Sequence, residues 1–388
     1  MAVEPFRLLV TGGGTGGHTY PALTTLRALQ ARLVAEGRVV QVLWVGTAGG
    51  LEARVAQAEQ IAFRAVATGK VRRSRNLLGM VNAENARDMA RVPLGVAEAR
   101  SVVAEFAPDV ILSTGGYVAV PVGIAAGLCR CPLVVHEQTV RLGLANRVLV
   151  RSASRVAVSS ESTLALLPQG VRRRTVVTGN PVRPQVLAGV AQRAVQVLGL
   201  SGFDPHLPTV YVTGGAQGAA QINVLVAEVL PWLLERANVV HQCGPSHVDA
   251  LRERTAGLPE HLAGRYLLTG FVGPELPDLL ALADVVLARS GAGTIAELTA
   301  LGKASVLVPL ASSAGNEQEY NARQLERAGA AVALIGQVGA QQLMQALGRV
   351  LDGRGVCEEM GVAARALGRP DAAERLVDVL VEAAAREG

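Results

Sequence analysis

Aromatic side chains are scarce in this sequence: Phe, Trp and Tyr together make up 3% of its 388 residues. Proteins that bind single-stranded nucleic acid stack the bases on aromatic rings, so the composition argues against a nucleic-acid partner. The hydrophobic content of 50% comes mainly from Val, Leu and Ala, and the charged content is 18%. This composition is typical of a soluble α/β protein, and the length suffices for two domains with separate cores.

Cysteine is also rare, with four residues in the chain. None of them forms a Cys-x-x-Cys pair, and Cys129-Arg130-Cys131 has a poor spacing for half of a zinc site. We therefore expect these thiols, which include Cys243 and Cys357, to stay reduced in a cytoplasmic protein.

Long hydrophobic runs are missing as well. The longest apolar stretch, Val118–Cys129, has about twelve residues, whereas a membrane-spanning helix needs about 20. The first residues lack the basic-then-apolar pattern of a secretory leader and run directly into the apolar stretch Phe6–Val10. Any contact with a membrane is therefore expected to be peripheral, on its cytoplasmic face.

Positive charge is concentrated in one half of the chain. Residues 1–181 contain 21 Lys and Arg against 11 Asp and Glu, a net charge of +10, whereas residues 182–388 contain 16 against 21, a net charge of −5. The basic half is expected to lie near an anionic partner, such as a phosphorylated lipid or the anionic inner-membrane surface. One basic and apolar cluster suits such a surface, although a solvated loop before a core-facing helix would also explain it. Its residues are Arg72, Arg73, Arg75, Leu77, Leu78, Met80 and Val81.

The most informative stretch is Thr11–His18, which contains five glycines. It follows the apolar run Phe6–Val10, which is typical of a buried parallel strand, and precedes a segment with apolar residues at helical spacing. A glycine-rich turn between a strand and a helix lets backbone N–H groups approach an anion at the positive end of the helix dipole. The stretch therefore predicts an anion site.

The spacing Gly12-x-Gly14-x-x-Gly17 also fits a dinucleotide-binding turn. That function needs an acidic residue at the end of the second strand to hold the ribose. Here the second apolar run, Gln41–Val45, is followed by Gly46-Thr47, and Glu52 comes too late. The sequence therefore disfavours a dehydrogenase.

Strand-like and helix-like segments alternate throughout, which is the pattern of parallel sheets covered by helices. The pattern restarts at Thr209–Thr213 with a second glycine turn, Gly214–Ala219, and residues 111–116 are echoed by residues 286–291. We predict two doubly wound, Rossmann-like α/β domains, comprising residues 1–181 and 182–369, which face each other across a cleft. The last helical segment, within residues 370–388, is expected to return to the first domain. The strands predicted in the first half are 39–45, 110–112, 133–135, 155–158 and 175–177.

A series of short motifs spans nearly the whole chain, and their joint order is more specific than any one of them. They are Thr11–His18 with Pro21, Gly46–Glu52, Gly115–Tyr117, His136–Gln138, Gly179–Arg183, Gly214–Ala219, Ser290–Glu297 and Gln318–Ala322. On these motifs the chain resembles the MurG family of bacterial glycosyltransferases, within glycosyltransferase family 28. The resemblance implies the GT-B fold, with an acceptor-binding, membrane-facing first domain and a donor-binding second domain.

The activity that the resemblance implies is transfer of N-acetylglucosamine from UDP-GlcNAc to the 4-hydroxyl of MurNAc in lipid I. The product would be lipid II, the peptidoglycan precursor. Expected partners are UDP-GlcNAc, lipid I, the membrane surface, and proteins of cell-wall synthesis and division. Two alternatives stay open: another GT-B lipid glycosyltransferase, such as one acting on diacylglycerol, and a non-catalytic sugar-nucleotide-binding protein. A substituted His18 or Glu297 would favour the second alternative, and neither is substituted.

In the first half, His18 is a candidate general base, because the pKa of an unperturbed imidazole lies near neutral pH. It is equally suited to donate a hydrogen bond to an acceptor phosphate, and Glu137 is then the alternative base. The residues expected to bind the acceptor are Gly13, Gly14, Thr15, Gly16, Gly17, Tyr117, His136, Gln138 and Asn146. The family usually has Asn where this chain has Thr139.

In the second half, the resemblance assigns Arg183 to the donor diphosphate and Glu297 to the ribose hydroxyls. The spacing Thr294-x-x-Glu297 also fits a helix capping box, which would give both residues a structural role. The family usually has Ser where Ala216 stands, which puts one donor contact in doubt. The residues expected to bind the donor are Arg183, Gly215, Ala216, Gln217, Gly218, Val272, Thr294, Glu297, Glu317 and Gln318.

The chain has no Asp-x-Asp motif, the usual metal-binding pair for a sugar-nucleotide diphosphate. Charge on the leaving group would then be offset by Arg183 and by helix dipoles. We therefore predict transfer without a metal or other cofactor, and with inversion at the anomeric carbon.

Overall fold

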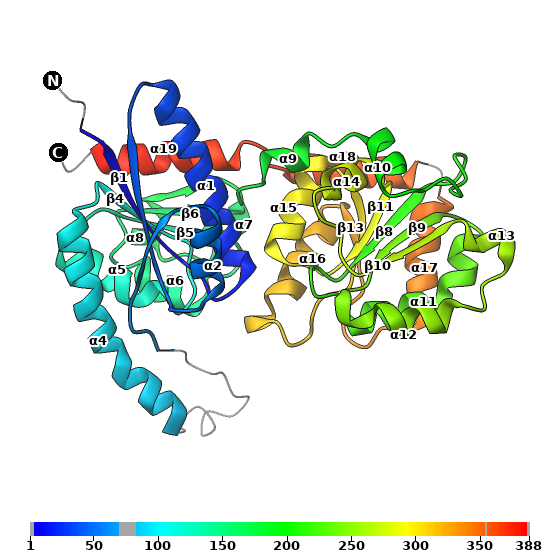
Figure 1. The fold of residues 1–388 in the computed structure, drawn as a ribbon, viewed down its shortest axis with the longest axis horizontal. Coiled ribbons are helices and arrows are strands. Elements are labelled where there is room, and N and C mark those ends of the chain that lie inside the picture. Colours follow the sequence, from blue (N-terminus) through cyan, green and yellow to red (C-terminus); the bar gives the residue numbers. More distant parts are fainter. Residues whose placement is uncertain (1–3, 70–82, 354, 386–388) are drawn as a thin grey trace. The chain divides into compact units, whose positions relative to one another are not determined.

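The computed structural model describes residues 4–69, 83–353 and 355–385. The chain divides into two compact units (Figure 1): unit 1 comprises Met1–Pro181 with Asp371–Gly388, and unit 2 comprises Val182–Pro370. The basic and apolar cluster between Arg72 and Val81 lies outside the described residues. Among the helices that are described, none is long and apolar enough to cross a membrane.

Unit 1 is built on a parallel sheet of seven strands in the order β3-β2-β1-β4-β5-β6-β7. Its central strands are continuous buried runs because helices cover both faces of the sheet. The strands are β1 (Phe6–Thr11), β2 (Val40–Gly46), β3 (Ala62–Ala65), β4 (Val110–Ser113), β5 (Leu133–Glu137), β6 (Arg155–Val158) and β7 (Thr175–Val177).

Successive side chains of these strands point into two separate cores. Leu8 and Val10 of β1 pack with helices α1, α2 and α19, whereas Leu9 packs with α4, α5, α6 and α8 on the opposite face. Unit 1 is therefore a three-layer α/β domain. Its helices are α1 (Gly16–Ala35), α2 (Leu51–Ala58), α4 (Ala83–Phe106), α5 (Ala119–Leu128), α6 (Leu144–Leu149), α7 (Glu161–Leu164), α8 (Gln169–Arg172) and α19 (Ala372–Ala385).

Helix α19 packs against α1, far from it in sequence (Figure 1). Leu376 and Leu380 are fully buried in the core that α1 also lines. An ion pair joins Asp378 to Arg32 of α1. Truncating a buried leucine of this kind costs about 2–5 kcal/mol, so α19 is an integral part of unit 1.

Unit 2 repeats the architecture with six parallel strands in the order β10-β9-β8-β11-β12-β13. Strands β8, β9, β11 and β12 are almost entirely buried, again because helices lie on both faces. The strands are β8 (Thr209–Thr213), β9 (Asn238–Gln242), β10 (Tyr266–Thr269), β11 (Val285–Ala288), β12 (Ala304–Leu307) and β13 (Ala331–Ala333).

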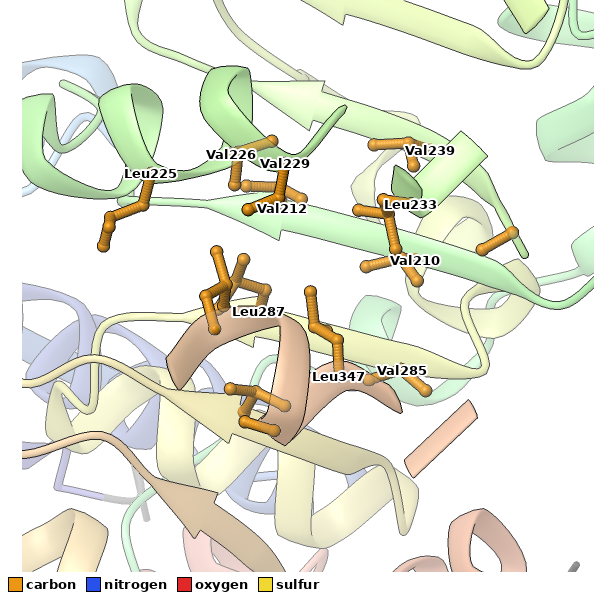
Figure 2. Packing of buried hydrophobic residues seen from close by; sticks show 14 of the residues in the cluster. Val210, Val212, Leu225, Val226, Val229, Leu233, Val239, Val285, Leu287 and Leu347 are labelled. Carbon is orange, nitrogen blue, oxygen red and sulfur yellow. The ribbon is translucent and has the colours of Figure 1, made fainter. Parts of the chain in front are cut away.

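One core of unit 2 lies between the sheet and helices α11 and α17. Figure 2 shows Val226 and Val229 of α11 over Val212 of β8, with Leu287 of β11 and Leu347 of α17 nearby. The opposite face is covered by α14, α15 and α16. The helices of unit 2 are α9 (Pro184–Leu187), α10 (Ala191–Val197), α11 (Ala220–Leu234), α12 (Val248–Thr255), α13 (Glu260–Ala263), α14 (Leu276–Leu282), α15 (Ala292–Leu301), α16 (Glu317–Arg327), α17 (Ala340–Leu351) and α18 (Val356–Leu367), with single 3₁₀ turns at Pro245–His247 and Ala314–Asn316.

The strand order reverses at the same place in both sheets. In unit 1 the first strand, β1, lies between β2 and β4, and in unit 2 the strand β8 lies between β9 and β11. Strands β4 and β11 therefore occupy equivalent positions, which confirms the echo between residues 111–116 and 286–291. Doubly wound sheets bind ligands beyond the carboxyl ends of the strands at this reversal, so each unit has one predicted ligand site.

Candidate active site

In unit 1, two glycine turns pack against each other beyond β1 and β4. Gly12 has φ +149°, and a Cβ there would overlap the Thr114 hydroxyl. Gly116 has φ +81°, and a Cβ there would lie 2.5 Å from the Gly13 carbonyl oxygen. Only glycine satisfies both the backbone angles and this close backbone contact.

Glu52, which is fully buried, binds the backbone of the first turn. Its carboxylate accepts hydrogen bonds from the N–H groups of Gly14 and Thr47, each at 3.0 Å. The Gly14 N–H is therefore already paired within the chain, and the predicted contact of Gly14 with the acceptor stays a prediction. The α1 helix begins immediately afterwards, and no intramolecular acceptor is found, within the described chain, for the N–H groups of Thr15, Gly16 and Gly17. The sequence motif included Glu52, but its contact with the turn joins residues too distant in sequence to predict.

The Tyr117 ring lies over the exposed side of the same turn. A Cβ on Gly14 would be 3.0 Å from that ring. Thr15 is exposed and caps no helix amide with its side chain. Gly13 is buried, whereas Gly14 and Gly17 are exposed, so the surface offered to a ligand runs from Gly14 into the first turn of α1.

His18 lies in that first turn, with an imidazole that is partly exposed. Its Nδ1 is 2.8 Å from the Thr114 carbonyl oxygen and 3.0 Å from Oε1 of Gln138. The Thr114 hydroxyl in turn donates to the His18 carbonyl at 2.9 Å. Its Nε2 has no partner among the described residues and is therefore available to a substrate.

The loop after β5 differs from its prediction. His136, Gln138 and Asn146 are expected to contact the acceptor, but they are 0%, 4% and 2% exposed. The strand β5 continues through Glu137, which places His136 within the sheet rather than beyond its end. The Asn146 amide donates to the His136 carbonyl at 3.2 Å. These side chains are buried and hydrogen-bonded within unit 1, and their predicted contact with the acceptor stays a prediction.

Glu137 is 2% exposed, and four groups donate to its two oxygens. They are the Thr139 N–H and hydroxyl, the Gly143 N–H and the Asn146 amide, at 2.8–3.1 Å. A carboxylate that is almost fully buried and surrounded by internal donors is poorly placed to take a proton from a substrate. In this structure Glu137 shapes the β5–α6 loop, and its alternative assignment as general base stays a prediction that this burial disfavours.

In unit 2, the second glycine turn follows β8 and exposes Gly215, Ala216 and Gln217. Gly218 closes it by donating to the Gly215 carbonyl at 2.9 Å, and its φ is +73°. The turn leads directly into α11, so its exposed backbone lies at the positive end of a helix of 15 residues.

Gln242, at the end of β9, is a site residue that the sequence gave no reason to select. It is 4% exposed and donates from Nε2 to the Gly215 carbonyl at 3.0 Å. Its Oε1 accepts from the Tyr211 hydroxyl at 2.9 Å and from the Val272 N–H at 3.2 Å. The predicted backbone contact of Val272 with a ligand can therefore use its carbonyl but not its N–H. No short motif surrounds Gln242, so only the fold brings these three segments together.

Arg183 and Glu297 form an ion pair, with Nη2 3.1 Å from Oε1. Burial raises the pKa of Glu297, whereas the adjacent guanidinium acts to lower it. The α15 helix begins at Ala292 with Gly291 as its N-cap, so Thr294 lies inside the helix. The capping-box interpretation of Thr294 and Glu297 is therefore wrong, and Glu297 is held by a charge instead.

The remaining predicted donor residues lie around the start of α16. The Gln318 side-chain oxygen accepts from the Leu310 N–H at 3.0 Å, which leaves its amide N–H₂ group for a ligand. The Ser290 hydroxyl donates to the Gln318 carbonyl at 2.7 Å, and Glu317 is the first residue of the helix. The half-buried Arg289, next to Ser290, donates to the Val308 carbonyl at 2.8 Å. Its fixed position beside the predicted donor residues was not expected from the sequence.

Within the residues that the structure describes, no group of three or more His, Cys, Asp or Glu side chains is arranged to hold a metal ion. The expectation of metal-independent chemistry stays a prediction.

The two halves of the chain match the N-terminal and C-terminal domains of one protein family. Residues 8–158 match the glycosyltransferase family 28 N-terminal domain, and residues 209–376 match the glycosyltransferase family 28 C-terminal domain. The chain belongs to glycosyltransferase family 28. The family resemblance predicted from the short motifs is confirmed, and so is the fold class of two doubly wound domains.

Family 28 relatives align with this chain along nearly its whole length. A relative from Bacillus licheniformis is 36% identical over 97% of this chain and 98% of its own length. One from Bacillus subtilis is 35% identical over 97% and 99%. Both are named UDP-N-acetylglucosamine–N-acetylmuramyl-(pentapeptide) pyrophosphoryl-undecaprenol N-acetylglucosamine transferase. The family 28 assignment therefore extends over both units.

Solved structures show the same architecture. MurG from Acinetobacter baumannii matches with a TM-score of 0.75 and 26% identity, covering 97% of this chain and 100% of that one. A UDP-GlcNAc 2-epimerase from Neisseria meningitidis, bound to UDP-GlcNAc, matches with a TM-score of 0.66 and 15% identity over 97% and 99%. The second likeness concerns the fold alone, because an identity this low does not carry an activity from one protein to another.

Proposed function

We propose that this family 28 enzyme transfers N-acetylglucosamine from UDP-GlcNAc to the 4-hydroxyl of MurNAc in lipid I, forming lipid II. The observation that carries the proposal is the identity of 36% over 97% of the chain with a relative named for this transfer. The geometry of the two units supports it, because each half-reaction has a matching set of groups. One set suits a proton transfer beside an anion, and the other suits the departure of an anion.

In unit 1, the free N–H groups of Thr15, Gly16 and Gly17 at the start of α1 bind the diphosphate of the acceptor. His18 is the general base. Its Nε2 is the ring nitrogen without a partner among the described residues, and it takes the proton of the 4-hydroxyl as that oxygen attacks the anomeric carbon. Because the Glu137 carboxylate is buried and hydrogen-bonded within the unit, His18 is the better candidate for the general base.

In unit 2, Arg183 offsets negative charge on the departing UDP, and Glu297 accepts hydrogen bonds from the ribose hydroxyls. The bond between the anomeric carbon and the UDP oxygen breaks as the new glycosidic bond forms on the opposite side of the sugar, so the configuration inverts. The electron pair leaves with UDP. The backbone N–H groups of Ala216 and Gln217 and the Arg183 guanidinium supply the compensating charge without a metal ion.

An undecaprenyl-linked acceptor is held in a bilayer, so the enzyme works at a membrane surface. The charge of +10 on residues 1–181 supports peripheral binding of unit 1 to the anionic cytoplasmic face. We propose that the cluster between Arg72 and Val81 contacts the membrane. Proteins of cell-wall synthesis and division are further proposed partners of the enzyme at the membrane. Replacing Arg72, Arg73 and Arg75 with Ser is expected to abolish binding to anionic vesicles. Undiminished binding would rule out this cluster.

The direct test is a transfer assay with labelled UDP-GlcNAc and a short-chain lipid I analogue. UDP-glucose and diacylglycerol are offered as competing substrates, and His206→Ala, which changes an exposed histidine of unit 2, is the matched control for variants of His18. Label is expected in the lipid I analogue alone. Transfer to diacylglycerol would favour the other lipid glycosyltransferases of this fold, and UDP-GlcNAc binding without transfer would favour a non-catalytic protein.

A further inference from the structure

A chain of hydrogen bonds runs from Gly179, just after β7, to the ring of His18. The donor and the acceptor of each bond can be assigned in turn, starting from the Gly179 end. The Gly179 carbonyl can only accept a hydrogen bond, and Nε2 of His136 lies 2.9 Å from it. The proton of His136 is therefore on Nε2. Burial lowers the pKa of His136 to about 4, so at neutral pH the ring is uncharged and Nδ1 holds a lone pair.

The next group in the chain is the Gln138 amide. One of its terminal atoms is 3.1 Å from His136 Nδ1 and 3.0 Å from the His136 carbonyl oxygen. Both of these atoms are acceptors, so the atom that faces them must be the N–H₂ group. The amide orientation is thereby fixed, and its oxygen, Oε1, is turned towards His18.

At the end of the chain, Nδ1 of His18 meets two oxygens, Thr114 O at 2.8 Å and Gln138 Oε1 at 3.0 Å. Neither oxygen can donate, so Nδ1 must carry the proton. The neutral ring then has its lone pair on Nε2, the nitrogen that faces away from these partners. A free imidazole in water favours the opposite tautomer, with the proton on Nε2, which is useless to a base acting through that atom.

We propose that His136 and Gln138 are positioning residues, which hold the His18 imidazole in the Nδ1–H tautomer and so keep Nε2 ready to accept a proton. The inference rests on the proposed function only for the use made of Nε2. It replaces the predicted contact of these two residues with the acceptor, which their burial argues against. After proton transfer, the same two oxygens stabilise the Nδ1–H group of the imidazolium.

The roles of the two residues differ. Gln138 provides an oxygen directly, whereas His136 acts through it, because only the lone pair on His136 Nδ1 and the His136 carbonyl dictate which way the amide points. A His136→Phe variant removes the Nδ1 lone pair and leaves the main-chain carbonyl of residue 136 as the remaining acceptor for the Gln138 amide. The amide is then held less firmly, and in part of the molecules it can turn its N–H₂ group towards His18, which favours the wrong tautomer. A Gln138→Met variant keeps the length and apolar bulk of the side chain but leaves Thr114 O as the remaining acceptor.

The test is ¹⁵N NMR of the full chain labelled at its histidine rings, with the His18 signals identified by their loss in His18→Ala. In the wild type, Nδ1 is expected to be protonated and Nε2 unprotonated. In Gln138→Met and His136→Phe, the fraction with the proton on Nε2 is expected to increase. Thr139→Val, which alters the same loop without touching the hydrogen-bond chain, is the matched control and should leave the tautomer unchanged.

Turnover supplies a second measurement. We expect kcat to fall about tenfold in Gln138→Met with little change in the KM for UDP-GlcNAc, a smaller loss than the about 10²–10⁴ of a missing base. An unchanged Nδ1–H tautomer in both variants would overturn the proposal. If His136→Phe does not fold, Gln138→Met decides alone. A tautomer shift in a protein that transfers no sugar would instead reject the proposed function and leave this inference standing.

Discussion

The two units share an architecture but hold their glycine turns with different chemistry. In unit 1 a buried carboxylate, Glu52, binds the backbone of the turn, whereas in unit 2 the neutral amide of Gln242 does so. For the functional side chains the order is reversed, with neutral partners in unit 1 and a charged partner in unit 2. Among the described residues, the hydrogen-bond partners of the His18 ring are neutral, whereas Arg183 is paired with the charge of Glu297.

This difference matches two different tasks. A base accepts its proton through a nitrogen with a free lone pair, and the neutral hydrogen-bond partners of His18 fix which ring nitrogen that is. A leaving diphosphate needs a permanent positive charge, and an arginine already held by a carboxylate is available in a defined place. The same fold therefore provides a titratable site in one unit and a fixed charge in the other.

The largest expected effect comes from removing the titratable group of unit 1. In His18→Ala, turnover should fall about 10²–10⁴-fold, because the other candidate base, Glu137, is buried and hydrogen-bonded within the unit. Binding of UDP-GlcNAc, measured by calorimetry, should be unchanged, since unit 2 keeps all its groups. Near-normal turnover would show that His18 only binds the acceptor phosphate.

The counterpart in unit 2 is Arg183→Ala, which should lower kcat by about 10²-fold through lost stabilisation of the leaving group. It should also raise the pKa of Glu297, because the guanidinium opposes the effect of burial on that carboxyl. Steady-state kinetics with each substrate varied in turn would measure the first effect. An unaltered rate would mean that helix dipoles suffice to offset the UDP charge.

Each unit also contains one buried neutral histidine, His136 in β5 and His241 in β9, each with a pKa lowered to about 4 by burial. Between pH 6.5 and 4, these two histidines are protonated in the unfolded chain but stay neutral in the folded protein. The free energy of unfolding therefore falls as the pH decreases through that range. The loss amounts to about 3 kcal/mol per ring. Urea unfolding at several pH values should show it.

His241→Gln separates the two contributions to this loss. Its unfolding free energy should depend less steeply on pH between 6.5 and 4 than that of the wild type, with the remaining slope arising in part from His136. An identical slope in the variant would mean that His241 is already protonated in the folded state.

A smaller effect is expected from the groups beneath the turns. Glu52→Gln turns one N–H₂ group towards a backbone N–H, so unfolding free energy should fall by about 1–3 kcal/mol and the KM for the lipid acceptor should rise. Gln242→Met in unit 2 should instead raise the KM for UDP-GlcNAc. If both variants raise the KM for the same substrate, the assignment of one substrate to each unit is wrong.

The smallest effect concerns metal ions. Activity should be unchanged by a chelator, because Arg183 and the helix termini are proposed to supply the positive charge that a metal would otherwise provide. Initial rates with and without EDTA in metal-free buffer test this. Loss of activity that Mg²⁺ restores would contradict the assignment of that role to Arg183.

Much of the fold follows from local patterns. The strands predicted at 155–158, 175–177 and 209–213 have those bounds in the structure. The first and the third are largely buried apolar runs, as expected for strands covered on both faces, whereas 175–177 is a partly exposed strand at the edge of the sheet. Short strands without such runs were not predicted: Ala62–Ala65 is largely exposed, and Ala331–Ala333 is mostly alanine. Their pairing depends on neighbours that are distant in sequence.

The site was predictable where a motif carries its own chemistry, as the glycine turns and His18 do. Burial was not predictable for Glu137 and His136, because a polar run after an apolar strand reads as a loop, whereas the strand here continues through both residues. Gln242 stands outside any motif, and Glu52 meets Gly14 only through the packing of α2 under the turn. Long-range contacts of this kind emerge from the fold alone.

The place of α19 has a consequence for how the chain is made. A ribosome releases all of Val182–Pro370 before Ala372–Ala385 emerges, so the half that is synthesised first completes its hydrophobic layer last. Until Leu376 and Leu380 arrive, the apolar side of α1 stays uncovered. Maturation of the base-bearing half thus waits until α19 has been synthesised, whereas the sugar-nucleotide half is free to fold earlier.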